Sequence, residues 1–218
     1  MLLTLRPAVG EQEDVSCGRS AAERIFVRRL KAIVMIYESH PWRADLKRFA
    51  RTLANARTMT MENESESARV ERAVMYGFFA LRKLEESDKL TKDTQSQTLK
   101  WHRFPAIIGK RMPRHKRQEL DDYFDMLSPE RVQLSPRELA NQVIHSYVFT
   151  HLVDSRDRLR GVFVASDRGR KRGVLYLPAW RIVLLFRRVA SDIPTYSSWT
   201  YDPKSGEYLY YAESRARK

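Results

Sequence analysis

Two polar side chains, Asn141 and His145, are four residues apart in a segment that is otherwise typical of a buried helix. Residues at this spacing lie one helical turn apart, so the amide and the imidazole would face the same region. Arg137 adds a guanidinium one turn before Asn141. Histidine titrates near neutrality, so His145 could act as a general acid or base on a phosphodiester that Asn141 and Arg137 contact. The alternative is an ordinary solvated helix face.

The helix that would position these groups is expected over residues 134–149. Ser135 can act as its N-cap, Pro136 suits the first helical position, and Glu138 completes a capping box. At about 100° per residue, one side of this helix is apolar and would pack against the protein. That side carries Leu139, Ala140, Val143, Ile144 and Tyr147.

Apolar periodicity predicts four further helices, at residues 20–39, 43–59, 66–87 and 178–192, and a shorter one at 114–127. Gly77 would allow a close helix crossing. The outer face of the second helix would carry Arg43, Lys47, Arg48, Arg51 and Arg57. Residues 87–113 show no sustained period and are expected to be a connection that packs through Trp101, Phe104, Ile107 and Ile108.

The C-terminal part has a different pattern. Residues 161–166 and 173–177 are short, rich in β-branched and aromatic residues, and separated by a turn-like segment, which predicts a β-hairpin. A second hairpin is expected in residues 195–214. These patterns together predict a mainly α protein, a helical bundle with a small C-terminal α+β appendage. The expected domains are an N-terminal arm at 1–19, a helical domain at 20–152 and an extension at 153–218.

The chain is strongly basic. Lys and Arg number 40 against 27 Asp and Glu, which gives a formal net charge of +13 over 218 residues. Such an excess favours a polyanionic partner, and nucleic acid fits best because phosphate contacts draw on Lys and Arg. An anionic membrane surface is an alternative, and so is a spread of charge that only keeps the protein in solution.

Two clusters concentrate this charge, and we predict that both bind nucleic acid. One is the turn of the first hairpin, with Arg168, Arg170, Lys171 and Arg172, and the other contains Lys110, Arg111, Arg114, Lys116 and Arg117. Cations grouped in this way can follow a phosphate backbone. The alternative for each cluster is a solvated run of charge.

Several classes of protein do not fit the sequence. Cys17 is the single cysteine, so an intrachain disulfide or a cysteine-based zinc site is excluded. The histidines offer no close pair of metal ligands, and phosphate-binding or dinucleotide-binding glycine motifs are absent. We therefore expect no metal and no cofactor. The absence of a long apolar run and of a signal peptide predicts a cytoplasmic protein without a membrane segment.

The string ANQVIHSY, residues 140–147, resembles the core motif of the HEPN superfamily, whose members are helical and mostly act on RNA. Asn141 matches the polar residue of that motif and His145 its histidine, while Ala140 stands where the family has an arginine. Arg137 is the nearest substitute. The resemblance implies metal-independent RNA cleavage that leaves a 2′,3′-cyclic phosphate, a homodimer with a composite site, and a role in bacterial stress or phage defence.

Three functions are therefore open. The first is an RNA-acting HEPN-like protein with His145, Asn141 and Arg137 at its site, with RNA favoured over DNA. The second is a non-catalytic nucleic-acid-binding or regulatory module that uses the two basic clusters. The third is an interaction protein whose tyrosine-rich C-terminal hairpin contacts a protein partner through Tyr196, Trp199, Tyr201, Tyr208, Tyr210 and Tyr211.

Overall fold

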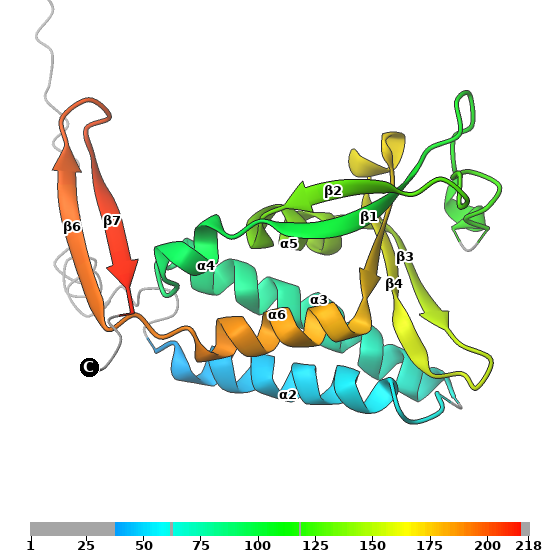
Figure 1. Cartoon of the computed structure of the whole chain (residues 1–218), viewed down its shortest axis with the longest axis horizontal. Helices are drawn as coiled ribbons and strands as arrows, with labels where there is room; N and C mark the ends of the chain where they lie inside the picture. The colour runs from blue at the N-terminus through cyan, green and yellow to red at the C-terminus, as the bar shows by residue number, and fades with distance from the viewer. Residues whose placement is uncertain (1–37, 62, 118, 215–218) are drawn as a thin grey trace, which may run out of the picture. The chain divides into compact units, whose positions relative to one another are not determined.

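The computed structural model describes residues 38–61, 63–117 and 119–214 (Figure 1). The expected arm at 1–19 and most of the helix expected at 20–39 lie outside these residues. The described elements, in chain order, are α2 (His40–Ala56), α3 (Glu64–Glu86), α4 (Lys92–Ser96), β1 (Leu99–Pro105), η1 (Arg114–Lys116), β2 (Glu130–Leu134), α5 (Pro136–Ile144), β3 (Ser146–Val153), β4 (Leu159–Ser166), η2 (Gly169–Lys171), β5 (Gly173–Pro178), α6 (Ala179–Ser191), β6 (Tyr196–Asp202) and β7 (Glu207–Glu213).

A five-stranded antiparallel sheet organises these elements, with strand order β2-β1-β5-β4-β3. The prediction of a mainly helical bundle is therefore wrong, and the fold is α+β. The predicted β4–β5 hairpin is confirmed, but it occupies the middle of the sheet and is not an appendage. The second predicted hairpin, β6–β7, is also confirmed and forms a separate two-stranded sheet.

Helix α5, which was expected over residues 134–149, begins as predicted but ends early. Ser135 Oγ accepts a hydrogen bond from the Glu138 backbone N–H at 3.2 Å, and Glu138 Oε2 accepts one from the Ser135 N–H at 2.7 Å. The helix nevertheless stops at Ile144, because residues 146–153 leave the helical path and pair with β4 as β3. The expected continuation of the helix to Phe149 is wrong: sheet pairing overrides the local helical pattern.

Two other elements also differ from expectation. Within the expected connection 87–113, residues 99–105 form β1, which pairs with β2 on one side and with β5 on the other. Trp101 is almost fully buried there. The helix expected at 114–127 is absent: the described residues of this segment form the 3₁₀ turn Arg114–Lys116, further turns and an isolated β-bridge from Phe124 to Ala106.

One face of the sheet is covered by helices. Side chains of β4 and β5, including Val162, Val164 and Leu177, join a buried cluster with α3, α5 and α6, and α2 packs on α3 and α6. Figure 1 shows α2, α3 and α6 running alongside one another. The predicted apolar stripe of α3 is confirmed as buried, and it comprises Val70, Val74, Phe78, Leu81 and Leu84.

The opposite face is covered by the β1–β2 connection, residues 106–129. Phe163 of β4 and Val174 of β5 belong to a second buried cluster, together with Met112, Leu120 and Phe124 of the connection. The later part of the connection, near Asp125, lies back against the end of β1 and the residues that follow it. The Asp125 N–H donates to the Pro105 carbonyl at 2.8 Å, and the Ile107 N–H donates to the Tyr123 carbonyl at 2.9 Å.

Arg43 is buried, so its predicted place on the outer face of α2 is wrong. Its Nη1 donates to the carbonyl of Val189, near the end of α6, at 2.8 Å, and its Nη2 donates to the carbonyl of Lys89. Desolvation lowers the pKa of Arg43, while the carboxylate of Asp192 raises it. Asp192 also accepts hydrogen bonds from the backbone and the hydroxyl of Thr91. This network joins α2 to the segments that end α6 and precede α4.

The expected domain boundary at residues 152 and 153 falls at the end of β3. Strands β3 and β4, on either side of it, are hydrogen-bonded neighbours in one sheet.

Gly77 on α3 provides a test of helix packing. A Cβ added there would lie 2.2 Å from Phe186 Cε2 on α6. We expect Gly77→Ala to lower the free energy of unfolding by about 1–2 kcal/mol, because overpacking outweighs the better helix propensity of alanine. Urea unfolding would measure the change. In a Phe186→Leu background the same substitution should cost much less, and an equal cost in both backgrounds would contradict this account.

Candidate nucleic-acid interface

The sheet brings parts of the two predicted basic clusters together. Lys110 and Arg111, from the β1–β2 connection, and Arg170 and Lys171, from the β4–β5 turn, line one hollow of about 330 Å³. Its other lining residues are mainly apolar. Lys110, Arg111 and Lys171 are exposed. Among the described residues, no carboxylate forms an ion pair with any of these three.

The backbone of Met112 holds the connection against the turn. Its carbonyl oxygen accepts a hydrogen bond from Tyr147 Oη at 3.2 Å and another from Arg170 Nη1 at 2.9 Å. The Met112 side chain is itself buried in the second cluster. Because two polar groups and one apolar side chain fix this residue, Lys110 and Arg111 are presented close to the β4–β5 turn.

Arg170 is a positioning residue and contributes little exposed charge. Its guanidinium lies 3.9 Å from the centre of the Tyr147 ring, and its Nε is 3.0 Å from Asp167 Oδ1. The side chain is only 10% exposed. Arg117 is placed similarly, with its guanidinium 4.4 Å from the centre of the same ring. Cation–π contacts of this kind are strongest where the cation is desolvated.

The remaining members of the clusters are more accessible. Arg168 and Arg172 are exposed on the turn, and Arg114 is exposed in the 3₁₀ turn. Lys116 forms an ion pair with Glu119, with its Nζ 2.7 Å from Glu119 Oε2. This hydrogen bond raises the pKa of Lys116. The predicted interface therefore divides into exposed cations, one lysine that is ion-paired with Glu119, and two arginines that order Tyr147.

The three predicted catalytic residues have different environments. Asn141 is half-buried, and its Oδ1 accepts a hydrogen bond from Arg82 Nη1 on α3. Arg137 is exposed, with its Nη1 4.0 Å from Glu85 Oε1. His145 is exposed at the C-terminal end of α5. The residues thus share the α5 region, but Asn141 is directed towards α3.

Arg82 is a residue that the sequence pattern did not indicate. It binds Asn141 and also lies 2.7 Å from Glu86 Oε1, one turn away on its own helix. Ala140, where the HEPN motif has arginine, is fully buried in the core. An arginine at position 140 would have to enter that core, so the guanidinium beside Asn141 comes from another helix.

The C-terminal end of α5 lies next to the basic turn. Ser146, directly after His145, pairs with Ser166 at the end of β4. The Ser166 N–H donates to Gln142 Oε1 at 3.2 Å, and Ser166 Oγ accepts from the Gly169 N–H at 2.9 Å. The backbone register therefore brings His145 close to the end of β4, where the basic turn begins.

A smaller notch of about 130 Å³ also adjoins this turn. Arg103 of β1 and Arg172 line it, together with Gln142, Glu138, Gly169 and their apolar neighbours. Burial lowers the pKa of Arg103, the nearby Arg172 lowers it further, and Glu130 raises it. The sequence placed Arg103 beside an aromatic cluster, and only the pairing of β1 with β5 brings it to the basic turn.

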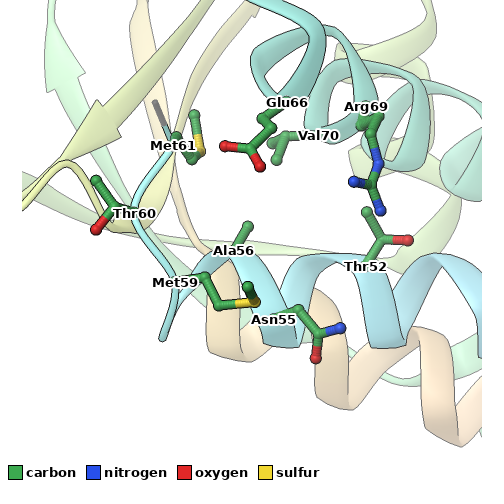
Figure 2. A pocket seen from close by; sticks show the side chains of 9 residues that line it. All are labelled: Thr52, Asn55, Ala56, Met59, Thr60, Met61, Glu66, Arg69 and Val70. Atoms are coloured by element: carbon green, nitrogen blue, oxygen red, sulfur yellow. The ribbon is translucent and has the colours of Figure 1, made fainter. Parts of the chain in front are cut away.

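Another hollow, of about 290 Å³, lies where α2 and α3 approach each other (Figure 2). Glu66 and Arg69 of α3 line it opposite Thr52 and Asn55 of α2. One carboxylate and one guanidinium give it no excess of positive charge. It is therefore less suited to a polyanion than the hollow at Lys110, Arg111 and Lys171.

The tyrosine-rich hairpin carries its aromatic residues in cross-strand pairs. The rings of Trp199 and Tyr210 are 4.8 Å apart, and those of Tyr201 and Tyr208 are 5.3 Å apart. Trp199, Tyr201 and Tyr208 are more than half exposed. These pairs stabilise the hairpin itself. The prediction that the hairpin contacts a protein partner stays a prediction.

Within residues 38–61, 63–117 and 119–214, no group of three or more His, Cys, Asp or Glu side chains is placed to hold a metal ion. In the same part of the chain, no helix is long and apolar enough to cross a membrane. Comparison with protein-family models, with curated proteins and with solved structures found no match for this chain.

Arg170 and Lys171 are neighbours with different expected effects on stability. Arg170→Ala should lower the free energy of unfolding by about 2 kcal/mol, because it removes a charged hydrogen bond to a buried carbonyl and a cation–π contact. Lys171→Ala should change it by less than about 0.5 kcal/mol, since the side chain is exposed. Denaturant unfolding of both variants would decide: equal stabilities would contradict the positioning role of Arg170.

Proposed function

We propose that this protein is a non-catalytic nucleic-acid-binding module whose principal contact surface is the hollow lined by Lys110, Arg111 and Lys171. The observation that carries the proposal is the convergence of cations from two distant segments on one hollow, without carboxylate partners among the described residues. RNA is the expected class, because the HEPN resemblance points to it.

Electrostatics supports this assignment. A concave surface lined by cations focuses positive potential and raises the local concentration of a polyanion. The net charge of +13 adds a long-range attraction that acts before contact. The walls of the hollow include the half-buried Ile107 and Tyr123, which offer apolar and aromatic surface to a base while the cations contact phosphates.

A second candidate function is metal-independent RNA cleavage, in which His145 is the general acid or base. It is favoured by the guanidinium of Arg82, which binds Asn141 where the HEPN motif would use a neighbouring arginine. His145 is exposed one turn beyond Asn141 and next to the basic turn. Under this proposal two chains would form a homodimer that brings two copies of the site together.

Binding should depend on the hollow more than on total charge. We expect the triple variant Lys110→Gln, Arg111→Gln, Lys171→Gln to bind a single-stranded RNA oligonucleotide more weakly. The slope of log affinity against log salt concentration should fall by about 2, because each lost phosphate contact removes about 0.7. Fluorescence anisotropy at several salt concentrations would measure both quantities.

The matched control is Lys47→Gln, Arg51→Gln, Arg187→Gln, which removes the same charge from exposed positions on α2 and α6. It should retain most of the affinity and the slope. Equal losses in the two triple variants would show that binding follows net charge alone, and would remove the hollow from the proposal.

The cleavage candidate has its own test. Purified protein is incubated with a mixed RNA pool in EDTA beside His145→Ala and Arg82→Gln, and the products are resolved on a denaturing gel. Cleavage predicts fragments ending in a 2′,3′-cyclic phosphate from the wild type only, with His145→Ala still binding RNA. Intact RNA in every lane, with binding retained, would reject cleavage and leave the binding module.

A further inference from the structure

The notch between β1, β5 and α5 gathers donors from three elements. Arg103 comes from β1, Arg172 from the β4–β5 turn, and Gln142 from α5. The Oε1 atom of Gln142 already accepts a hydrogen bond from the Ser166 N–H, so its amide group is held at a fixed place beside the turn. Two guanidiniums and an amide are the donor types that proteins use for phosphate and other oxyanions.

Two glycines are required for this arrangement. A Cβ on Gly173, whose φ is +143°, would lie 2.9 Å from Arg103 Cγ and 2.2 Å from the Phe104 carbonyl oxygen. A Cβ on Gly169 would lie 2.3 Å from Gln142 Oε1. Side chains at these two positions would displace the donors, so the backbone of the turn is shaped to let Arg103 and Gln142 approach.

The notch is lined by two guanidiniums and one carboxylate, that of Glu138, so positive charge is in excess there. Glu130 pairs with Arg103 across β1 and β2 but forms no ion pair with it among the described residues. Glu138 lines the notch, yet its Oε2 accepts from the backbone and the hydroxyl of Ser135 at 2.7 and 2.9 Å. The half-buried guanidinium of Arg103 and the exposed one of Arg172 therefore share a small space, and an anion with two charges would stabilise this arrangement.

We propose that this notch binds a terminal phosphate of a nucleic-acid strand. The inference rests on the proposed function and assigns the end of the bound strand to Arg103 and Arg172. The volume of about 130 Å³ admits a phosphate but is well below that of pockets for larger ligands. A terminal phosphate carries close to two negative charges and an internal phosphodiester only one. Consecutive residues of the turn line the two sites: Arg170 and Lys171 line the hollow, and Arg172 lines the notch.

The first experiment compares single-stranded RNA oligonucleotides of one sequence that carry a 5′-phosphate, a 3′-phosphate or no terminal phosphate. Wild-type protein should bind one phosphorylated form about tenfold more tightly than the form with two hydroxyl ends, as expected for charge-assisted hydrogen bonds from two arginines. Arg103→Gln and Arg172→Gln should each abolish this preference. Arg168→Gln, on the same turn but outside the notch, should preserve it.

The second experiment uses inorganic phosphate alone and does not depend on nucleic acid. Titration of ¹⁵N-arginine-labelled protein should shift the Nε–Hε resonances of Arg103 and Arg172 in a saturable way. Arg103→Lys, which keeps the charge, should retain part of the binding that Arg103→Gln loses, and circular dichroism would verify that each variant is folded.

The outcomes separate the two proposals. If no oligonucleotide binds but inorganic phosphate shifts both arginines, the nucleic-acid function is overturned and the notch remains a site for free phosphate. If oligonucleotides bind with no preference for a terminal phosphate, the strand-end assignment is overturned while the binding module stands. The absence of any shift on phosphate titration would overturn the notch as an anion site.

Discussion

The rest of the structure depends on the burial of both faces of β4. Its side chains alternate between the helix-covered cluster, which contains Val162 and Val164, and the second cluster, which contains Phe163. An apolar strand in the middle of a sheet must be covered on both sides. The helices supply one cover and the irregular 106–129 connection supplies the other. That second cover explains how a long segment with little regular structure is held at a defined place.

The electrostatics of the surface follow from the same constraint. The connection is fixed through Met112 against Tyr147 and Arg170, so its cations meet those of the β4–β5 turn. Some basic residues thus serve the fold, and their neighbours are left exposed. Arg170 and Lys171 are adjacent in sequence, yet one is enclosed by an aromatic ring and a carbonyl while the other faces the hollow.

Local signals were sufficient for several elements and insufficient for the sheet. The capping box at Ser135 located the start of α5, and β-branched and aromatic residues on either side of a turn-like segment located β4 and β5. Residues 146–153 lacked any signal strong enough to end the helix, because their strand conformation is stabilised by pairing with β4. Charge runs indicated both basic clusters. That the two clusters line one hollow could not be predicted, and neither could the positions of Arg82 and Arg103, because these depend on sheet register and on helix packing between distant segments.

The buried Arg43 has a consequence for the order in which the chain folds during synthesis. Its hydrogen bond to the Val189 carbonyl spans 146 residues, and α2 packs against α6, which is made far later. At ribosomal rates of about 5–20 residues per second, α2 would wait roughly 7–30 s for that partner. Throughout this interval α2 can pack on α3 but not on α6, and the Arg43 guanidinium lacks its hydrogen bond to Val189. The nascent chain is therefore expected to be most dependent on chaperones between the synthesis of α2 and the completion of α6.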